Sequence, residues 1–164
     1  MAGMTAHDKR IMTFMDDKHA EYVERMKAAA PDSDFSVLIQ FQPVTQSIVK
    51  HSLERGGNVL GLEHVVSEDE PSAIMWLIAV TVDTEENQAK IHPLTLEYRA
   101  AVDAYADEIG INKGWRFLNY ALGDQDPIGA YGEESVAFVK ATAQKYDPEG
   151  VFQKLRGSGF KIPA

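Results

Sequence analysis

Residues 73–82 (AIMWLIAVTV) form an almost unbroken apolar run. A strand with one face in water alternates apolar and polar residues, whereas an unbroken run of this length is typical of a strand buried on both faces. An acidic loop, residues 67–72, precedes the run, and Asp83 follows it. We therefore predict a central β-strand here, with the rest of the chain arranged around it.

A second strand is predicted over residues 36–42 (SVLIQFQ), where β-branched and aromatic residues dominate and Pro43 follows. Alternate positions point to opposite faces of a sheet. One predicted face carries apolar side chains: Val37, Ile39 and Phe41. The other carries a mixed set: Ser36, Leu38, Gln40 and Gln42. The apolar face suits a core covered by helices, and the mixed face can line a pocket or a wet interface.

Turn signals and apolar spacing predict the remaining elements. We expect a short strand over residues 10–15 (RIMTFM), followed by a helix that begins at Asp16 and Asp17 and ends before Pro31. Another strand is expected over residues 59–64 (VLGLEH). Three further helices are expected over residues 45–55, 84–109 and 133–145. The order of elements indicates an α+β fold, a largely antiparallel sheet with helices packed on one face in a ferredoxin-like arrangement.

Composition limits the class of protein. The chain has 164 residues and 45% hydrophobic content, enough for one sizeable core, so we expect a single domain over residues 1–164. A formal net charge of −9 argues against a nucleic-acid partner. No cysteine is present, so disulfides and cysteine metal sites are excluded. No apolar stretch has the length of a signal-peptide core or a membrane span, and we expect a cytoplasmic protein with no membrane partner.

Residues 117–153 hold the densest set of turn signals in the sequence. The stretch contains four motifs: Phe117-Leu118-Asn119-Tyr120, Gln125-Asp126-Pro127, Lys145-Tyr146-Asp147-Pro148 and Val151-Phe152-Gln153. Together they resemble the C-terminal signature of FAD-linked oxidases of the berberine-bridge-enzyme type. Upstream, residues 41–43 (FQP), residues 56–62 (GGNVLGL) and the strand around Trp76 resemble the substrate-binding domain of the fungal members.

The resemblance implies a substrate-binding domain in which the Asn-Tyr and Gln-Asp-Pro motifs pass close to the flavin. It does not include the N-terminal FAD-binding domain, which supplies most of the FAD contacts in that family. Residues 55–58 (RGGN) follow a predicted helix, whereas a phosphate loop joins a strand to a helix. We therefore expect no cofactor on this chain alone; the alternative is FAD shared with a missing domain or a partner chain. Phe117 stands where many members carry Tyr.

Four side chains are candidates for a catalytic role: Asn119, Tyr120, Gln40 and Gln42. Asn119 and Tyr120 belong to the resembling motif, and an amide with a phenol can orient a carbonyl or enol by hydrogen bonding. Gln40 and Gln42 share one strand face, so both can point into one cavity. The alternatives are structural: Asn119 satisfies loop backbone, Tyr120 packs with its hydroxyl at the surface, and the glutamines lie on an exposed sheet face.

Five further residues are candidates for substrate binding: Trp76, Phe117, Gln125, Thr81 and His64. The two aromatic residues can form a pocket wall or belong to the core. Gln125 lies in a turn that can face the pocket, and Thr81 is polar within the central strand. His64 can act as a general base or lie at the surface. The histidines show no zinc-ligand spacing, so no metal is expected.

Three functions stay open at this point. The first is a stand-alone substrate-binding domain that acts without flavin as a cyclase, isomerase or pericyclase on a small secondary metabolite. We expect it to be a homodimer, because self-association would cover its open sheet face. The second is the C-terminal part of a split or truncated FAD-dependent oxidoreductase. The third is a non-catalytic protein that binds a metabolite.

Overall fold

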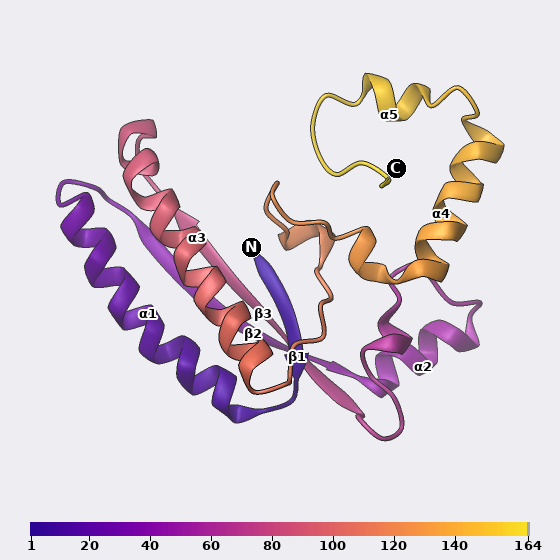
Figure 1. Cartoon of the computed structure of the whole chain (residues 1–164), viewed down its shortest axis with the longest axis horizontal. Helices are drawn as coiled ribbons and strands as arrows, with labels where there is room; N and C mark the ends of the chain where they lie inside the picture. Colours follow the sequence, from indigo (N-terminus) through magenta and orange to yellow (C-terminus); the bar gives the residue numbers. More distant parts are fainter. Residues whose placement is uncertain (164) are drawn as a thin grey trace.

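The computed structural model describes residues 1–163. Within this range β1 (Ala2–Ala6), β2 (Ser36–Thr45) and β3 (Ser72–Thr81) form an antiparallel sheet in the order β1-β3-β2 (Figure 1). The predicted central strand is confirmed as β3, since it has a neighbour on each side. The predicted second strand is confirmed as β2, which continues through Pro43 to Thr45. Pro43 is tolerated there because β2 is an edge strand.

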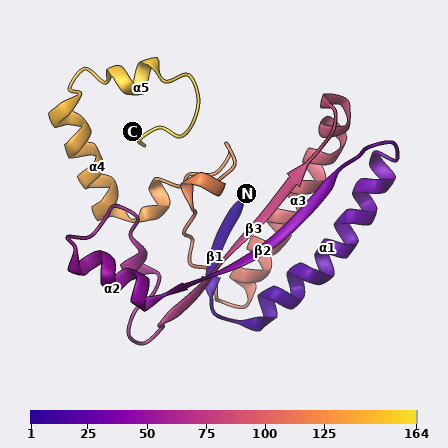
Figure 2. The same ribbon diagram turned by 180° about the vertical axis from the view of Figure 1, so that it is seen from behind.

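Two long helices, α1 (Lys9–Ala29) and α3 (Glu85–Glu108), lie side by side on one face of the sheet (Figures 1 and 2). The main core fills the space between them and the sheet, with Trp76 from β3 fully enclosed. Tyr98 of α3 donates a hydrogen bond from its hydroxyl to the Met15 carbonyl oxygen of α1 at 2.6 Å, and its ring stacks on Tyr22. These contacts join the two helices within the core.

The order of strands and helices reproduces the first three strands of a ferredoxin-like arrangement. On the outer edge of β1, the Ala6 amide donates to the Ile111 carbonyl oxygen (2.8 Å), and the Lys113 amide donates to the Met4 carbonyl oxygen (2.9 Å). A short segment after α3 therefore pairs along the outer edge of the sheet. The predicted α+β fold, an antiparallel sheet with helices packed on one face, is confirmed.

The prediction for the first 30 residues is wrong in its boundaries. Residues 10–15 form no strand; they belong to α1, whose N-cap is Asp8, with its carboxylate accepting from the Arg10 amide. Ile11 and Met15 are both buried, one helical turn apart on the face that meets the sheet. A short apolar run fits a strand and a helix equally well, and here the helical spacing prevails because the helix can bury both residues. The first strand is β1, whose residues AGMTA are mostly small and do not show the β-branched and aromatic composition typical of a strand.

The strand predicted over residues 59–64 is also wrong. Residues 59–61 form a turn, and Leu62–His64 is a short 3-10 helix. Gly61 has φ +64°, and a Cβ there would overlap the Tyr131 carbonyl oxygen. Only glycine adopts this left-handed conformation at such close approach, so the chain turns here instead of extending.

The rest of the chain builds a second core against the other face of the sheet. The helices predicted over residues 45–55 and 133–145 are confirmed as α2 (Gln46–Glu54) and α4 (Glu133–Tyr146), and a short helix, α5 (Val151–Leu155), follows α4. The second core is formed by Met4, Val44, Val49, Val65, Val66, Ala73, Met75, Trp115 and Tyr131. It covers only one end of that face, and α4 and α5 project beyond it (Figure 1).

Candidate functional site

The open face of the sheet changes from buried to exposed along its length, in rows set by the strand register. Val44 of β2 and Ala73 of β3 form the first row, which the second core covers. The next row holds Gln42, Met75 and Met4. This face of the sheet is therefore buried at the end near Val44, half-buried at Gln42, and exposed at the end near Leu38.

The exposed end of this face carries both glutamine and leucine side chains. Gln40 pairs with Leu77, and Leu38 pairs with Ala79. Gln40 is exposed, Leu38 is 55% exposed, and Leu77 and Ala79 are half-buried. These four residues form an uncovered patch, which we call the sheet floor. An apolar floor with one amide suits a largely apolar molecule that carries a polar group.

Gln42 and Tyr120 border the sheet floor and contact each other. The Gln42 side-chain amide donates to the Tyr120 hydroxyl oxygen at 3.3 Å. Because that hydroxyl accepts from the amide, its own proton is free to point to a second acceptor. The pair joins residues far apart in the sequence, one on β2 and one at the end of a 3-10 turn, Leu118–Tyr120. It can donate a hydrogen bond to a carbonyl or enol oxygen on the sheet floor.

Stacked aromatic rings hold this turn in place. Phe117 meets Tyr120 edge to face, with centroids 5.1 Å apart, and stacks on Trp115 at 5.9 Å. The Trp115 indole N–H donates to the Leu60 carbonyl oxygen at 2.6 Å. Tyr131 packs on Trp115, its hydroxyl accepts from the Leu118 amide, and burial raises the pKa of that phenol. Tyr120 is thereby positioned by buried neighbours, although it is itself only half-buried.

Gln125 fixes the loop that follows the turn. Its side-chain oxygen accepts from the Leu122 amide, and its side-chain nitrogen donates to the Ala2 carbonyl oxygen on the outer edge of β1, both at 3.0 Å. The amide is therefore used within the protein and ties residues 122–125 to the sheet. Gln125 therefore holds the loop beside the candidate site in place and has both ends of its amide group bonded within the protein.

Asn119 occupies the exposed apex of the turn. It is next to Tyr120 in the chain and at the solvent side of the candidate site. Of the four residues predicted to be catalytic, the structure thus brings Gln42 and Tyr120 into contact and leaves Gln40 and Asn119 exposed. Their catalytic role stays a prediction.

Three predicted binding residues lie elsewhere. Trp76 is 1% exposed in the main core, on the opposite face of the sheet. Thr81 lies at the far end of β3, where it lines a cavity of about 500 Å³. His64 is exposed and lies against Gly132 at the start of α4. The structure therefore places these three residues apart from the Gln42–Tyr120 pair.

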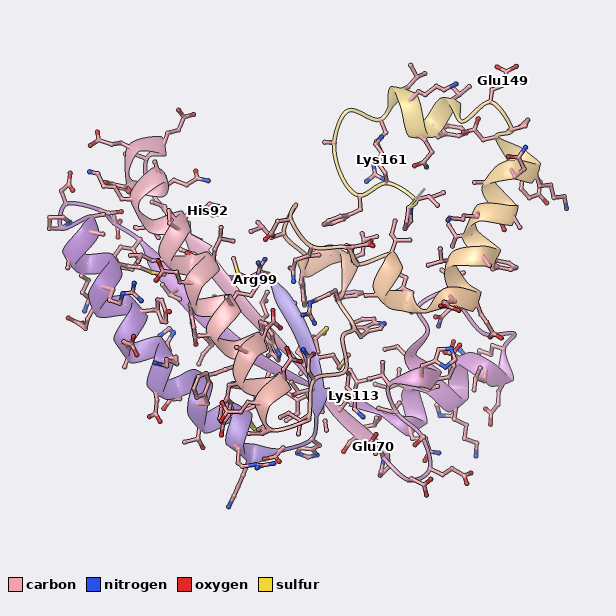
Figure 3. The ribbon with its side chains drawn as sticks, viewed as in Figure 1. Glu70, His92, Arg99, Lys113, Glu149 and Lys161 are labelled. Atoms are coloured by element: carbon pink, nitrogen blue, oxygen red, sulfur yellow. The ribbon has the colours of Figure 1, made fainter. Side chains whose placement is uncertain are left out.

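A charged cluster beside the loop was not predicted from the sequence. Arg99 of α3, labelled in Figure 3, forms an ion pair with Asp124 (2.7 Å). Arg116 forms an ion pair with Asp103 (2.9 Å). Burial raises the pKa of Asp103, and the Arg99 guanidinium lowers that of Asp124. No spacing signal could have revealed this cluster, because its members lie in three separate segments. It holds the Gln125 loop against α3.

Residues 1–163 contain no cluster of three or more metal-ligating side chains. Their helices are all too short or too polar to cross a membrane. The two glycines of the RGGN segment follow α2 and have open space around them. A flavin pyrophosphate binds where such a loop joins a strand to a helix N-terminus, so this segment does not fit that group.

The structure thus defines an α+β domain with an open sheet face bordered by an amide–phenol pair. No family model matches the chain, and no solved structure matches it. It is 32% identical over 156 residues to the FAD-dependent monooxygenase drtC of Aspergillus calidoustus, covering 95% of this chain and 29% of that protein. It is 35% identical over 140 residues to the FAD-dependent monooxygenase sdcF of Emericella nidulans, covering 85% and 28%.

A third relative is the bifunctional solanapyrone synthase of Alternaria solani, 26% identical over 142 residues, covering 87% of this chain and 26% of that protein. The chain therefore spans about three tenths of the length of the curated relatives it matches. It resembles part of larger, FAD-linked fungal enzymes.

Proposed function

We propose that this chain supplies the substrate-facing part of a FAD-dependent monooxygenase of fungal secondary metabolism, with the flavin held by residues outside the chain. The observation that carries the proposal is the match to such enzymes over 95% of this chain but only 29% of the relative. The substrate would lie on the sheet floor with a carbonyl or enol oxygen at the Gln42–Tyr120 pair. Apolar surface and a side-chain hydrogen-bond donor lie next to each other there.

The roles of the residues follow from their places. The Tyr120 hydroxyl, accepting from Gln42, would donate to the substrate oxygen and stabilise negative charge that develops there. Asn119, at the open apex, would add a second donor, and Gln40 would contact the substrate from the floor. Phe117 would form the aromatic wall and would hold the Tyr120 ring edge-on.

A chimera tests this proposal. The matched 156 residues of the Aspergillus calidoustus relative are replaced by this chain, and bound flavin and turnover of the relative's substrate are measured. We expect the folded chimera to hold flavin and to turn over. In it, Tyr120→Phe should lower kcat/KM by about tenfold or more, since a lost transition-state hydrogen bond costs at least about 1.4 kcal/mol.

The control is Met12→Ala, an exposed change on α1, which lies on the opposite side of the sheet. It should leave kcat/KM unchanged. A chimera that shows one cooperative melting transition but holds no flavin would contradict the proposal.

A second function is favoured by the same pair of side chains. An amide that donates to a phenol can polarise a carbonyl without redox chemistry, and one relative is named a synthase as well as bifunctional. The chain would then act alone, as a homodimer, as a cyclase, isomerase or pericyclase. Product formed from a pathway intermediate by flavin-free protein would support this function; tight binding without product would indicate a metabolite-binding protein.

A further inference from the structure

The central strand has neighbours of unequal length. β2 pairs with β3 from Ser36–Thr81 to Thr45–Ser72, whereas β1 pairs only from Ala2–Leu77 to Ala6–Ala73. The end of β3, residues 79–81, therefore has a described strand on one side only. In Figure 1 the chain's N-terminus lies alongside the middle of β3, and the strand continues past it.

The hydrogen bonds of Ile78 show which backbone groups face the vacant side. The Met1 amino group donates to the Ile78 carbonyl oxygen, and the Ile78 amide donates to the Met1 carbonyl oxygen, both at 2.9 Å. In an antiparallel ladder, residues two apart direct their backbone groups to the same side. The N–H and C=O of Val80 therefore point to the side where no described strand lies, away from its β2 neighbour Val37.

A hollow of about 500 Å³ adjoins this edge. Its strand side is formed by residues 78–82 and its helix side by α3, where Ile91 is fully buried and His92 is exposed (Figure 3). Leu122, from the loop after the candidate site, closes another side. Buried apolar residues, Ile78 and Ile91, and exposed polar residues, Thr81, Gln88 and His92, both line the hollow.

An extended peptide is the ligand that matches both features of this edge. Its backbone can form ladder hydrogen bonds with the N–H and C=O of Val80, and its side chains can enter the hollow beside residues 78–82.

We propose that this edge of β3 binds an extended strand of the polypeptide that carries the flavin, antiparallel to β3 and bonded to the backbone of Val80. The identity of the occupant rests on the proposed function, because about seven tenths of each relative's length has no counterpart in this chain. Pairing of a second copy through the same edge is disfavoured. In an antiparallel pair of copies only residues 79–81 of each β3 could face each other, because β1 and Met1 occupy the edge from Ala73 to Ile78 in both copies.

The first test uses a covalent surrogate and is independent of the proposed function. Thr-Val-Thr-Val is added before Met1, so that its residues continue β1 opposite residues 79–82, and Gly-Ser-Gly-Ser is added in the control. We expect the Val80 amide to exchange with solvent at least about tenfold more slowly with the strand-forming extension, and the melting temperature to rise. Equal exchange rates in the two proteins would overturn the proposal.

The second test identifies the occupant. The Aspergillus calidoustus relative without its matched residues is supplied as a separate chain, and its affinity for this chain is measured. Val80→Pro removes the edge N–H at a position where an edge strand tolerates proline, and Val80→Thr keeps both shape and N–H. We expect Val80→Pro, but not Val80→Thr, to weaken the complex at least tenfold.

Equal affinity of the two variants, or no complex with the unsubstituted chain, would overturn the assignment of the strand to the flavin polypeptide. Failure of the chimera would instead overturn the proposed function, because there the missing segments are joined covalently. The result with the extensions would still stand in that case. The three experiments therefore separate the edge, its occupant and the function.

Discussion

Gly3 of β1 is paired with Trp76 of β3, and the core leaves no room for a methyl group at position 3. A Cβ at Gly3 would overlap the indole ring of Trp76, which is enclosed on all sides and cannot move away. We expect Gly3→Ala to destabilise the protein by about 1–3 kcal/mol, the usual cost of overpacking a core. The measurement is chemical denaturation followed by Trp fluorescence.

Gly123→Ala is the matched control, since nothing lies within 4 Å of a Cβ there. It should change the free energy of unfolding by about 0.5 kcal/mol or less. If both variants unfold at the same denaturant concentration, the packing of Trp76 over Gly3 is not as described.

Asp83 provides a prediction about pH. Its carboxylate accepts from the Ser33 hydroxyl (2.7 Å) and the Asp34 amide (3.2 Å), and these bonds lower its pKa to about 2. The pKa in the unfolded chain is higher, so this contribution to stability is complete above the unfolded value and is lost as the pH falls towards about 2. Asp83→Asn should therefore lower the melting temperature near neutral pH, and the difference from the unsubstituted protein should shrink through this acid range.

The comparison is made by thermal melts of both proteins at matched ionic strength. A difference in melting temperature that stays constant from neutral to strongly acidic pH would show that the carboxylate charge is not what these hydrogen bonds stabilise. Asp83 joins the start of β2 to the end of β3, so its effect should extend to both strands.

At the scale of elements, one carboxylate starts the last helix. Asp147 ends α4, and its two oxygens accept from the amides of Val151 (2.8 Å) and Phe152 (2.9 Å). Pro148 precedes α5 and lies outside it. The short helix therefore depends on one side chain.

Asp147→Ala should cost α5 about 1 kcal/mol, the usual value of a cap, and speed amide exchange at Val151 and Phe152 about fivefold. Glu149→Ala removes a carboxylate from the same turn without touching these two bonds, and should leave both exchange rates unchanged. The global melting temperature should stay the same in both variants because α5 is exposed. Unchanged exchange in Asp147→Ala would contradict this account of the helix start.

At the scale of the whole molecule, the sheet and the α4–α5 arm differ in how much they bury. The main core is enclosed by α1, α3 and the sheet, whereas Ser135 is the buried residue of α4. The arm exposes five large apolar side chains: Phe138, Tyr146, Val151, Phe152 and Leu155. An exposed apolar surface of this kind is available for contact with other molecules, and hydrophobic dye binding measures it.

The double change Phe152→Ser and Leu155→Ser should lower the fluorescence of a bound hydrophobic dye such as ANS. It should shift the melting temperature by about 2 °C or less, because exposed substitutions change stability little. Met12→Ser, a change at an exposed apolar residue of α1, should leave dye binding as it was. Dye fluorescence that is equal in all three proteins would show that the arm is not the accessible apolar surface.

The sequence by itself determined the central strand, because residues 73–80 are apolar without a break. Burial on both faces is wrong for the end of that strand, where Leu77 and Ala79 are half-buried and Thr81 is exposed. The sequence also determined the two faces of β2, since alternation separates Phe41 from Gln42. It left residues 10–15 ambiguous, because a short apolar run can be strand or helix, and only packing on the sheet decided for α1. It did not reveal the turn at Gly61, which the approach of Tyr131 requires.

Sequence motifs also singled out Gln42 and Tyr120, but their contact was decided by tertiary structure. The two residues are 78 positions apart, and no local preference links them. They meet because β2 lies beside β3 and because the Trp115 and Phe117 rings hold the later turn over the same face. The edge at Val80 was likewise decided by tertiary structure. Residue type predicts that Val80 lies in a strand, but only the unequal lengths of β1 and β2 show that its backbone N–H and C=O face no described strand.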